Sequence, residues 1–164
     1  MWRDKRRNQK VSTRKRILSI ILAVLVAIQF IHPVKNTSTA EQKGDITKHF
    51  NVPEDIHNVL KTSCYDCHSN NTNYPWYANI QPLSWLLANH IKEGKADLNF
   101  NEFSGYSKRR QLSKLKAVAN SVKDGSMPLS SYTLMHRDAK LDDFKKQLIM
   151  DWFIKAKDSL DGLQ

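Results

Sequence analysis

The 164-residue sequence contains few of the features that mark several large protein classes. It has only five glycines, and none of them belongs to a glycine-rich phosphate-binding loop. No segment repeats, and no segment shows the alternating apolar and polar pattern of a β-strand. These absences exclude a P-loop nucleotide-binding domain and a repeat array. They predict an all-α fold of helices joined by irregular loops.

A large excess of positive charge is missing from most of the chain, although the net charge is +10. The first 16 residues hold eight basic residues and one acid, which gives this segment alone a charge of +7. The rest of the chain is therefore close to neutral for its length. The basic composition does not predict nucleic-acid binding, because the charge belongs to one terminal segment.

Charge is absent from residues 17–31, an almost wholly apolar run that follows the basic segment. This order is typical of a secretory signal or a signal anchor. Because residues 29–32 are bulky and offer no cleavage site, we expect an uncleaved signal anchor, a transmembrane helix over residues 17–34. The positive-inside rule keeps residues 1–16 in the cytoplasm. We thus expect a single-pass protein of the cell inner membrane with its remaining residues on the periplasmic side.

Cysteine is scarce as well, since the only two lie in the pentapeptide Cys64-Tyr65-Asp66-Cys67-His68. Two thiols three positions apart, with an imidazole directly after the second, form the attachment signature of a c-type haem. Each thiol can add to one vinyl group of the haem to give a thioether, and His68 can ligate the iron from beneath the ring. We predict one covalent haem c, held by Cys64 and Cys67, with His68 as the proximal ligand.

Three other uses of the two thiols fit the sequence less well. A thioredoxin-like redox pair follows a strand, and no strand-like segment precedes Cys64. A structural zinc site needs four ligands, whereas the chain offers only scattered histidines outside the motif. A plain disulfide leaves His68 without a role.

Between the anchor and the motif, residues 35–49 are polar without apolar periodicity, which predicts a flexible tether. A cytochrome c-like helical domain is expected over residues 50–164. Its helices are predicted from caps and apolar spacing. The first begins near Pro53, the second opens at Pro82 and stops at Gly94, the third is capped by Ser104 or Ser107 and ends at Gly125, and the last begins near Leu141.

The sixth ligand of the iron is the main open choice. Met127 lies 59 residues after His68, in a Met-Pro pair that resembles the distal ligand loop of mono-haem class I cytochromes c. Its thioether sulfur is a soft ligand that favours ferrous iron. We predict Met127 as the sixth ligand, with Met135 and His136 as alternatives in the same stretch. His90, on an apolar helix face, is a further alternative.

Several short motifs occur together: Cys-Tyr-Asp-Cys-His-Ser-Asn at 64–70, Tyr-Pro-Trp-Tyr at 74–77, His-Ile-x-x-Gly at 90–94, Leu-Asn-Phe at 98–100 and Met-Pro-Leu-x-x-Tyr at 127–132. In this combination the chain resembles the bacterial haem-binding domain family, small exported cytochrome c-like proteins common in the Bacteroidetes, over about residues 33–156. The resemblance implies covalent haem at Cys64 and Cys67 and iron ligation by His68. It implies no established reaction, and it keeps His90 as a candidate haem contact.

These observations predict a membrane-anchored electron carrier on the periplasmic side, which is not an enzyme. Haem attachment in c-type cytochromes is completed outside the cytoplasmic membrane, so the export segment and the motif predict the same compartment. We expect transient redox partner proteins, attachment to the membrane through the N-terminal helix, and no nucleic acid. The alternative functions are a peroxidase-like haem enzyme, or a redox or gas sensor, with a labile or open sixth position. A third is an interaction module whose iron never changes oxidation state.

Overall fold

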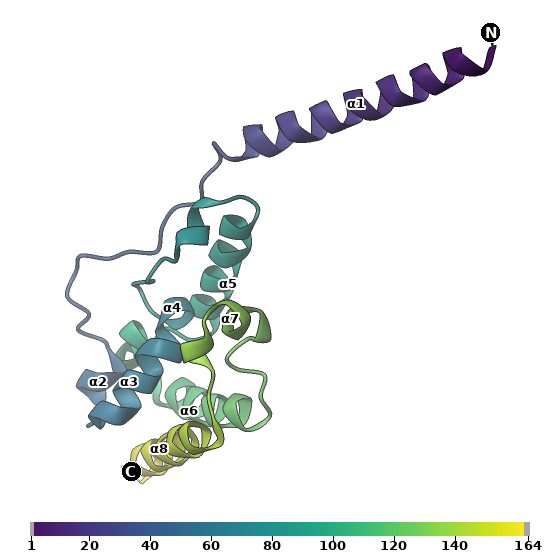
Figure 1. Ribbon diagram of the computed structural model, residues 1–164. Coiled ribbons are helices and arrows are strands. Elements are labelled where there is room, and N and C mark those ends of the chain that lie inside the picture. Colours follow the sequence, from purple (N-terminus) through teal and green to yellow (C-terminus); the bar gives the residue numbers. More distant parts are fainter. Residues whose placement is uncertain (1, 163–164) are drawn as a thin grey trace. The chain divides into compact units, whose positions relative to one another are not determined.

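The computed structural model describes residues 2–162, and every regular element in this range is a helix (Figure 1). The predicted all-α fold is confirmed. The α-helices are α1 (Trp2–Ile28), α2 (Ile46–His49), α3 (Glu54–Ser63), α4 (Tyr65–His68), α5 (Leu83–Asp97), α6 (Lys108–Lys123), α7 (Ser130–Met135) and α8 (Asp143–Asp161). Three short 3-10 helices are η1 (Trp76–Asn79), η2 (Phe100–Gly105) and η3 (Arg137–Ala139).

The chain divides into two compact units. The N-terminal unit contains the residues up to Val34 together with Pro75–Asn89. The main unit contains Lys35–Tyr74 and the residues from His90 onward. All the predicted haem-binding residues therefore belong to the main unit, which begins earlier in the chain than the expected domain boundary at residue 50.

In the N-terminal unit, α1 continues through the basic segment and ends at Ile28. Gln29 and Gln81 then pair reciprocally: the Gln29 side chain donates to the Gln81 carbonyl at 3.2 Å, and the Gln81 amide donates to Gln29 Oε1 at 3.0 Å. The Ile31 carbonyl accepts from Gln81 Nε2 and from Trp85 Nε1. These bonds hold residues 29–31, which lie outside any helix, against Gln81 and the first turn of α5.

The expected transmembrane helix over residues 17–34 is not found. Within residues 2–162, no helix is long and apolar enough to cross a membrane. The apolar part of α1 runs only from Ile17 to Ile28, which falls short of the roughly 20 residues that a span needs. Pro33 further disfavours helical backbone at the residue before it.

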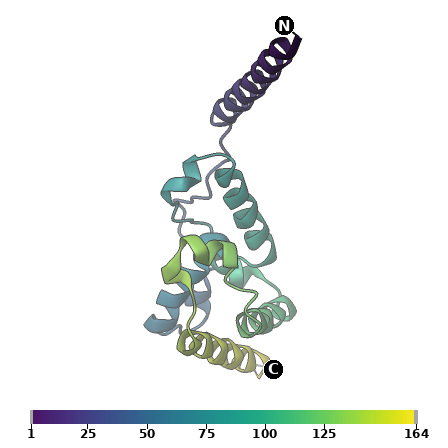
Figure 2. The same ribbon diagram turned by 45° about the vertical axis from the view of Figure 1, so that its right-hand side comes forward.

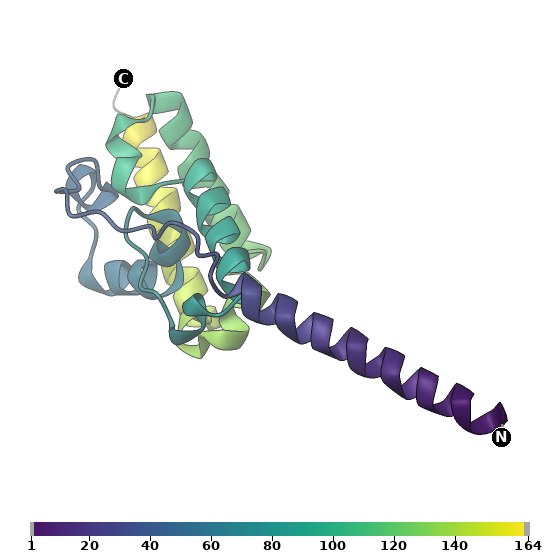
Figure 3. The same cartoon turned by 90° about the horizontal axis from the view of Figure 1, so that it is seen from above.

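The core of the main unit forms where α6 and α8 lie side by side (Figures 1 and 3). Each helix buries one face at three- and four-residue spacing. The aromatic rings of Phe100, Phe103 and Phe153 fill the space beside this helix pair. The buried residues of the two faces are Gln111, Leu115, Ala119 and Val122 on α6, and Ile149, Phe153, Ala156 and Leu160 on α8.

Helix ends follow the sequence signals in most cases. Ser107 caps α6, because its hydroxyl accepts from the Arg110 amide. Gly125 follows α6 with a φ of 74°, a conformation that favours glycine. The final helix begins at Asp143 rather than near Leu141, because Asp142 caps it by accepting from the Lys145 amide at 2.7 Å.

Residues 35–49 differ from the flexible tether that their polarity predicts. The Asn36 side chain donates to the Ser69 carbonyl and to Thr72 Oγ1, both at 2.9 Å. Further along, Ile46 begins helix α2 and is completely buried. Polar side chains here bind backbone and side-chain groups of the domain, so their lack of apolar periodicity does not make the segment mobile.

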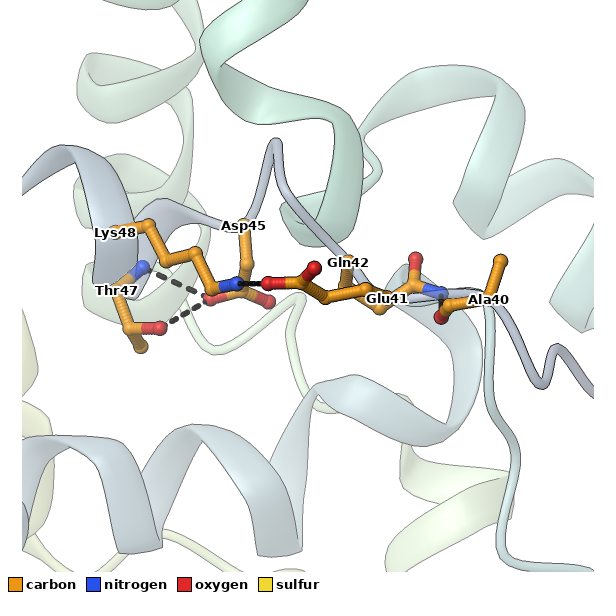
Figure 4. A network of polar contacts seen from close by, with 6 residues as sticks. All are labelled: Ala40, Glu41, Gln42, Asp45, Thr47 and Lys48. Carbon is orange, nitrogen blue, oxygen red and sulfur yellow. Dashed lines mark hydrogen bonds and ion pairs between the residues drawn. The ribbon is translucent and has the colours of Figure 1, made fainter.

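Asp45 anchors this segment in the main unit. Its side chain is 7% exposed and accepts from the Thr47 amide at 2.8 Å and the Thr47 hydroxyl at 2.6 Å (Figure 4). The Asn101 side chain also donates to Asp45. In the nearby ion pair between Lys48 and Glu41 both side chains are exposed, so the pair contributes little to stability.

The contact from Asp45 to Asn101 begins a buried polar network of asparagines. Asn101 Oδ1 accepts from the Asn70 amide at 2.8 Å, and the Asn101 amide donates to Asn99 Oδ1 at 3.1 Å. Asn99 Nδ2 donates to Asn70 Oδ1 at 2.8 Å. This network joins three segments: residues 42–47, the loop that follows His68, and residues 99–101 at the end of α5.

Helix α5 does not stop at Gly94 but continues to Asp97. A Cβ atom at Gly94 would lie 2.7 Å from the Cys67 carbonyl oxygen and 3.1 Å from Cys67 Cβ. Gly94 therefore allows α5 to approach the backbone of α4 closely. Its role is packing against the predicted haem motif rather than ending the helix, which is why the sequence prediction of the helix end was wrong.

We expect Asp45→Ala to lower the free energy of unfolding by about 2–4 kcal/mol, because it removes a helix cap and takes away the Asp45 oxygen that accepts from the buried side-chain Nδ2 of Asn101. Chemical denaturation measures this loss. The matched control is Asp142→Ala, which removes an exposed cap and should cost only about 1 kcal/mol. Equal losses in the two variants would contradict a buried network at Asp45.

We expect Gly94→Ala to destabilise the protein by about 1–3 kcal/mol, because the new Cβ meets backbone atoms of Cys67 that cannot move freely. Elsewhere in a helix the same change stabilises, so the sign of the effect is diagnostic. Thermal unfolding of Gly105→Ala serves as the control, since a Cβ at Gly105 meets no atom within 4 Å. A stabilised Gly94→Ala variant would show that α5 and α4 are not in close contact.

Candidate functional site

The predicted haem motif is built on one turn of chain at the end of α3. The Cys64 amide donates to the Leu60 carbonyl at 2.9 Å and so closes that helix. The Cys64 carbonyl in turn accepts from the amides of Cys67 at 3.2 Å and His68 at 3.0 Å. These bonds form α4 and bring both thiol-bearing residues and the imidazole into a single helical turn.

The His68 ring is fixed by a backbone group of another segment. His68 Nδ1 lies 3.0 Å from the Leu98 carbonyl oxygen. Because a carbonyl can only accept, the proton of the neutral ring lies on Nδ1, which leaves the Nε2 lone pair free in that form. This is the tautomer that a metal-ligating histidine needs, with the outer hydrogen bond orienting the ring.

Phe100 supports both this ring and the motif from the core side. Its side chain is 1% exposed, and its ring stacks on that of Tyr65 at a centroid distance of 5.3 Å. The His68 ring makes an edge contact with Phe100 at 6.2 Å. The buried Phe100 ring therefore packs against the imidazole.

Cys64, His68 and Met127 line one cavity in the main unit. About 600 Å³ in and around the cavity is not filled by protein atoms, and part of this volume is open solvent. Apolar groups form most of its wall. The other lining residues are Ser63, Asp97, Leu98, Phe100, Lys114, Ala117, Val118, Ser121, Val122, Pro128 and Leu141.

One ion pair lies at the edge of this apolar wall. Lys114 Nζ is 2.6 Å from Asp97 Oδ1, and the Lys114 side chain is the more buried of the two. Lys114 projects from α6, and Asp97 ends α5. The pair gives the cavity a charged border on the side where these two helices meet it.

The segment that carries Met127 is held at the end of α6. The Met127 amide donates to the Ser121 carbonyl at 3.1 Å, and the Ser126 amide donates to Asp124 Oδ1 at 2.9 Å. Met127 is 37% exposed while lining the cavity. Its side chain thus lies at the cavity opening.

The other ligand candidates do not line this cavity in the described part of the chain. Met135 is 51% exposed on α7, and the His136 ring stacks on that of Tyr132 at 4.3 Å. His90 is half-buried on α5. Cys67 also lies outside the lining, with its carbonyl and Cβ against Gly94.

Both thiols are free and half-buried. Burial raises the pKa of Cys64 to about 12, and burial together with the charge of Asp66 raises the pKa of Cys67 to about 11. Neither group is therefore a thiolate near neutral pH, unlike the reactive cysteine of a thioredoxin-like pair. Among the side chains that the structure describes, those of residues 12–162, no three His, Cys, Asp or Glu gather as metal ligands.

Sequence reasoning missed two contributors to the site. Leu98 acts through its backbone carbonyl, and side-chain type does not reveal such a role. The family resemblance points to the Leu-Asn-Phe stretch at 98–100 only as part of the haem surround. Gly94 had been assigned to a helix end, and only the approach of Cys67 shows why a side chain is excluded there. Both act by supporting the motif rather than by contributing a ligand.

Comparison with known families gives a match to the model for the haem-binding domain over residues 23–155. This range includes the whole motif, the cavity-lining residues and Met127. The comparisons with curated proteins and with solved structures find no match. Since the family match covers most of the chain and its site, the protein belongs to the haem-binding domain family.

Proposed function

We propose that this haem-binding protein is a c-type cytochrome-like electron carrier with one covalent haem. The observation that carries the proposal is the common cavity of Cys64, His68 and Met127, together with the hydrogen bond that fixes the His68 tautomer. When bound, haem supplies an iron couple that accepts and donates single electrons. The protein supplies attachment, ligands and an apolar surround.

Each residue of the chain has a distinct task in this proposal. Cys64 and Cys67 would hold the macrocycle through thioether bonds, each formed when an S–H group adds across one vinyl double bond of the haem. His68 Nε2 ligates the iron while the Leu98 carbonyl orients the ring. Met127 provides a soft sulfur ligand from the opening of the cavity. The apolar wall excludes water, which favours ferrous iron.

The arrangement supports electron transfer better than peroxide chemistry. A peroxidase needs an open iron position and an acid–base group beside it. His90 and His136, the candidates for that group, are not among the described residues that line the cavity. Two protein ligands and a partly open cavity suit a carrier that exposes one haem edge to a transient redox partner.

We also propose that the domain works on the periplasmic face of the inner membrane. The basic and apolar segments of residues 1–34 would direct the chain there, and their order supports this reading. Covalent haem attachment outside the cytoplasm requires the same export. Targeting and cofactor can therefore be tested in one experiment.

We expect the full chain, made in a bacterium with c-type haem attachment machinery, to gain the mass of one haem. Replacing Leu22 and Leu25 by arginine interrupts the apolar run and should leave the chain inside the cell without covalent haem. Both side chains are exposed in the N-terminal unit, so the main unit stays intact. Intact-mass spectrometry of the fractionated cells gives the result and shows whether the N-terminus is cleaved.

The matched control replaces the same two leucines by alanine, which keeps the run apolar and should preserve haem attachment. Cys64→Ser with Cys67→Ser should be exported but lack covalent haem. A haem mass retained in that double variant, or in the cytoplasmic fraction, would contradict the proposal.

We expect Met127→Ala to abolish the weak sulfur-to-iron absorption band of the ferric protein and to open the sixth position to carbon monoxide. The reduction potential should fall by an amount on the order of 0.1 V, a fraction of the roughly 0.8 V that axial ligands cover. Optical titration measures both changes. Met135→Ala is the control, because Met135 is exposed on α7 outside the cavity lining.

If Met135→Ala or His136→Ala removes the native ligand while Met127→Ala does not, the assignment of Met127 is wrong. A wild-type protein that is high-spin and binds peroxide readily would instead favour a haem enzyme or sensor. A wild-type protein without an accessible couple would favour an interaction module.

A further inference from the structure

Asp66, the residue between the two motif thiols, makes a contact that the proposed function does not use. Its Oδ1 atom accepts from the Asn73 amide at 2.9 Å, which shapes the loop after the motif. Its Oδ2 atom accepts from the Tyr132 hydroxyl at 2.7 Å. The second bond joins positions 66 residues apart and has no part in closing the motif turn.

Tyr132 belongs to the segment that carries Met127. We define residues 124–132 as the ligand strap, which leads from the end of α6 through Met127 and Pro128 into α7. Figures 1 and 2 show α7 (green) beside α4 (blue) in both views. The hydrogen bond from Tyr132 to Asp66 thus ties the strap to the motif itself.

At its first end the strap is tied to α6. The Met127 amide and the Ser126 hydroxyl both donate to the Ser121 carbonyl, at 3.1 and 3.3 Å. The Asp124 side chain accepts from the Ser126 amide. These short-range bonds fix the strap on the approach to Met127 but place no constraint on the residues after it.

At its second end the strap has little apolar burial to hold it. Helix α7 has only six residues, none of them buried, and its N-cap residue Leu129 makes no side-chain cap bond. Leu134 and Met135 are exposed. The hydrogen bond to the Asp66 carboxylate, from a tyrosine ring stacked on His136, is the strongest kind of contact described at this end.

We propose that Tyr132 is a positioning residue whose hydrogen bond to Asp66 latches the ligand strap and sets how firmly Met127 occupies the sixth iron position. This inference rests on the proposed function. The latch makes the motif serve both faces of the haem: its thiols and imidazole hold the proximal side, and its Asp66 carboxylate holds the strap that closes the distal side. Opening the latch removes the tie between the strap and Asp66, while the hydrogen bond between His68 and the Leu98 carbonyl comes from a different segment.

The central test is Tyr132→Phe in the haem-loaded full chain, titrated with imidazole as a competing iron ligand. Loss of one charge-assisted hydrogen bond should raise the imidazole affinity about tenfold and weaken the sulfur-to-iron band. His68 should remain the proximal iron ligand in this variant. Asp66→Asn removes the charge and leaves one oxygen for the Asn73 amide and the Tyr132 hydroxyl, but its side chain can still hydrogen-bond to Tyr132. Its imidazole affinity should therefore lie between those of wild type and Tyr132→Phe.

Tyr74→Phe is the matched control. It removes a hydroxyl that accepts from the Asn36 amide at 2.6 Å, in the same unit but outside the ligand strap. It should leave the imidazole affinity at the wild-type value. If Tyr74→Phe raises the affinity as much as Tyr132→Phe, the effect is general loosening and the latch is refuted.

A second measurement does not depend on haem. Hydrogen–deuterium exchange of the haem-free chain should be faster at residues 127–132 in Tyr132→Phe than in wild type, with residues 64–68 unchanged. The latch is refuted if Tyr132→Phe has the same exchange rates and the same imidazole affinity as wild type. If wild type still shows the sulfur-to-iron band, the proposed ligation by Met127 is not affected. A wild-type protein without that band overturns the proposed ligation by Met127 and the role of the latch with it.

Discussion

The arrangement of the site depends on the hydrogen bond between His68 Nδ1 and the Leu98 carbonyl. This bond decides which ring nitrogen is available to a metal. The bond itself depends on where the Leu98 carbonyl is held. Two constraints set that position. The Leu98 amide donates to the Gly94 carbonyl at 2.9 Å, which continues α5, and the next residue, Asn99, enters the buried polar network. The tautomer of one imidazole is thus controlled by a helix end and by side chains from three separate segments.

Helix α5 therefore acts on both ends of the haem motif. Gly94 lets its backbone meet Cys67, and four residues later Leu98 meets His68. A shift of this helix by even a fraction of an ångström would move both contacts together, since a helix transmits displacement along its axis. The buried network opposes such a shift: Asn99 bonds to the loop after His68, and Asn101 bonds to Asp45. The polar residues of the supposed tether are thus part of the site's support.

Residue type and spacing point to candidate ligands more readily than to the groups that hold them. Of the residues predicted to bind haem, Cys64, His68 and Met127 line one cavity, whereas Cys67 lies outside its lining. Ser107 and Gly125 were recognised because caps demand particular residues. Leu98 was missed because any residue supplies a carbonyl, and Gly94 because a glycine that admits a neighbour looks like one that ends a helix. The prediction of a flexible tether over residues 35–49 was wrong because polar residues are exposed only on average. Polar groups can be buried when they are hydrogen-bonded.

The two sides of the proposed haem site are held by unequal means. On the side of His68, the contacts are buried: Asn99 and Asn101 belong to the core, and Phe100 is almost inaccessible. On the side of Met127, the strap lies at the cavity opening and is held by hydrogen bonds rather than by apolar packing. Local opening costs least where few apolar contacts are lost, so the distal side opens at a lower free energy than the proximal side. In the proposed haem site the sixth ligand would therefore exchange before the fifth. The Asp66 carboxylate, between the two predicted attachment thiols, would make that difference a property of the motif itself.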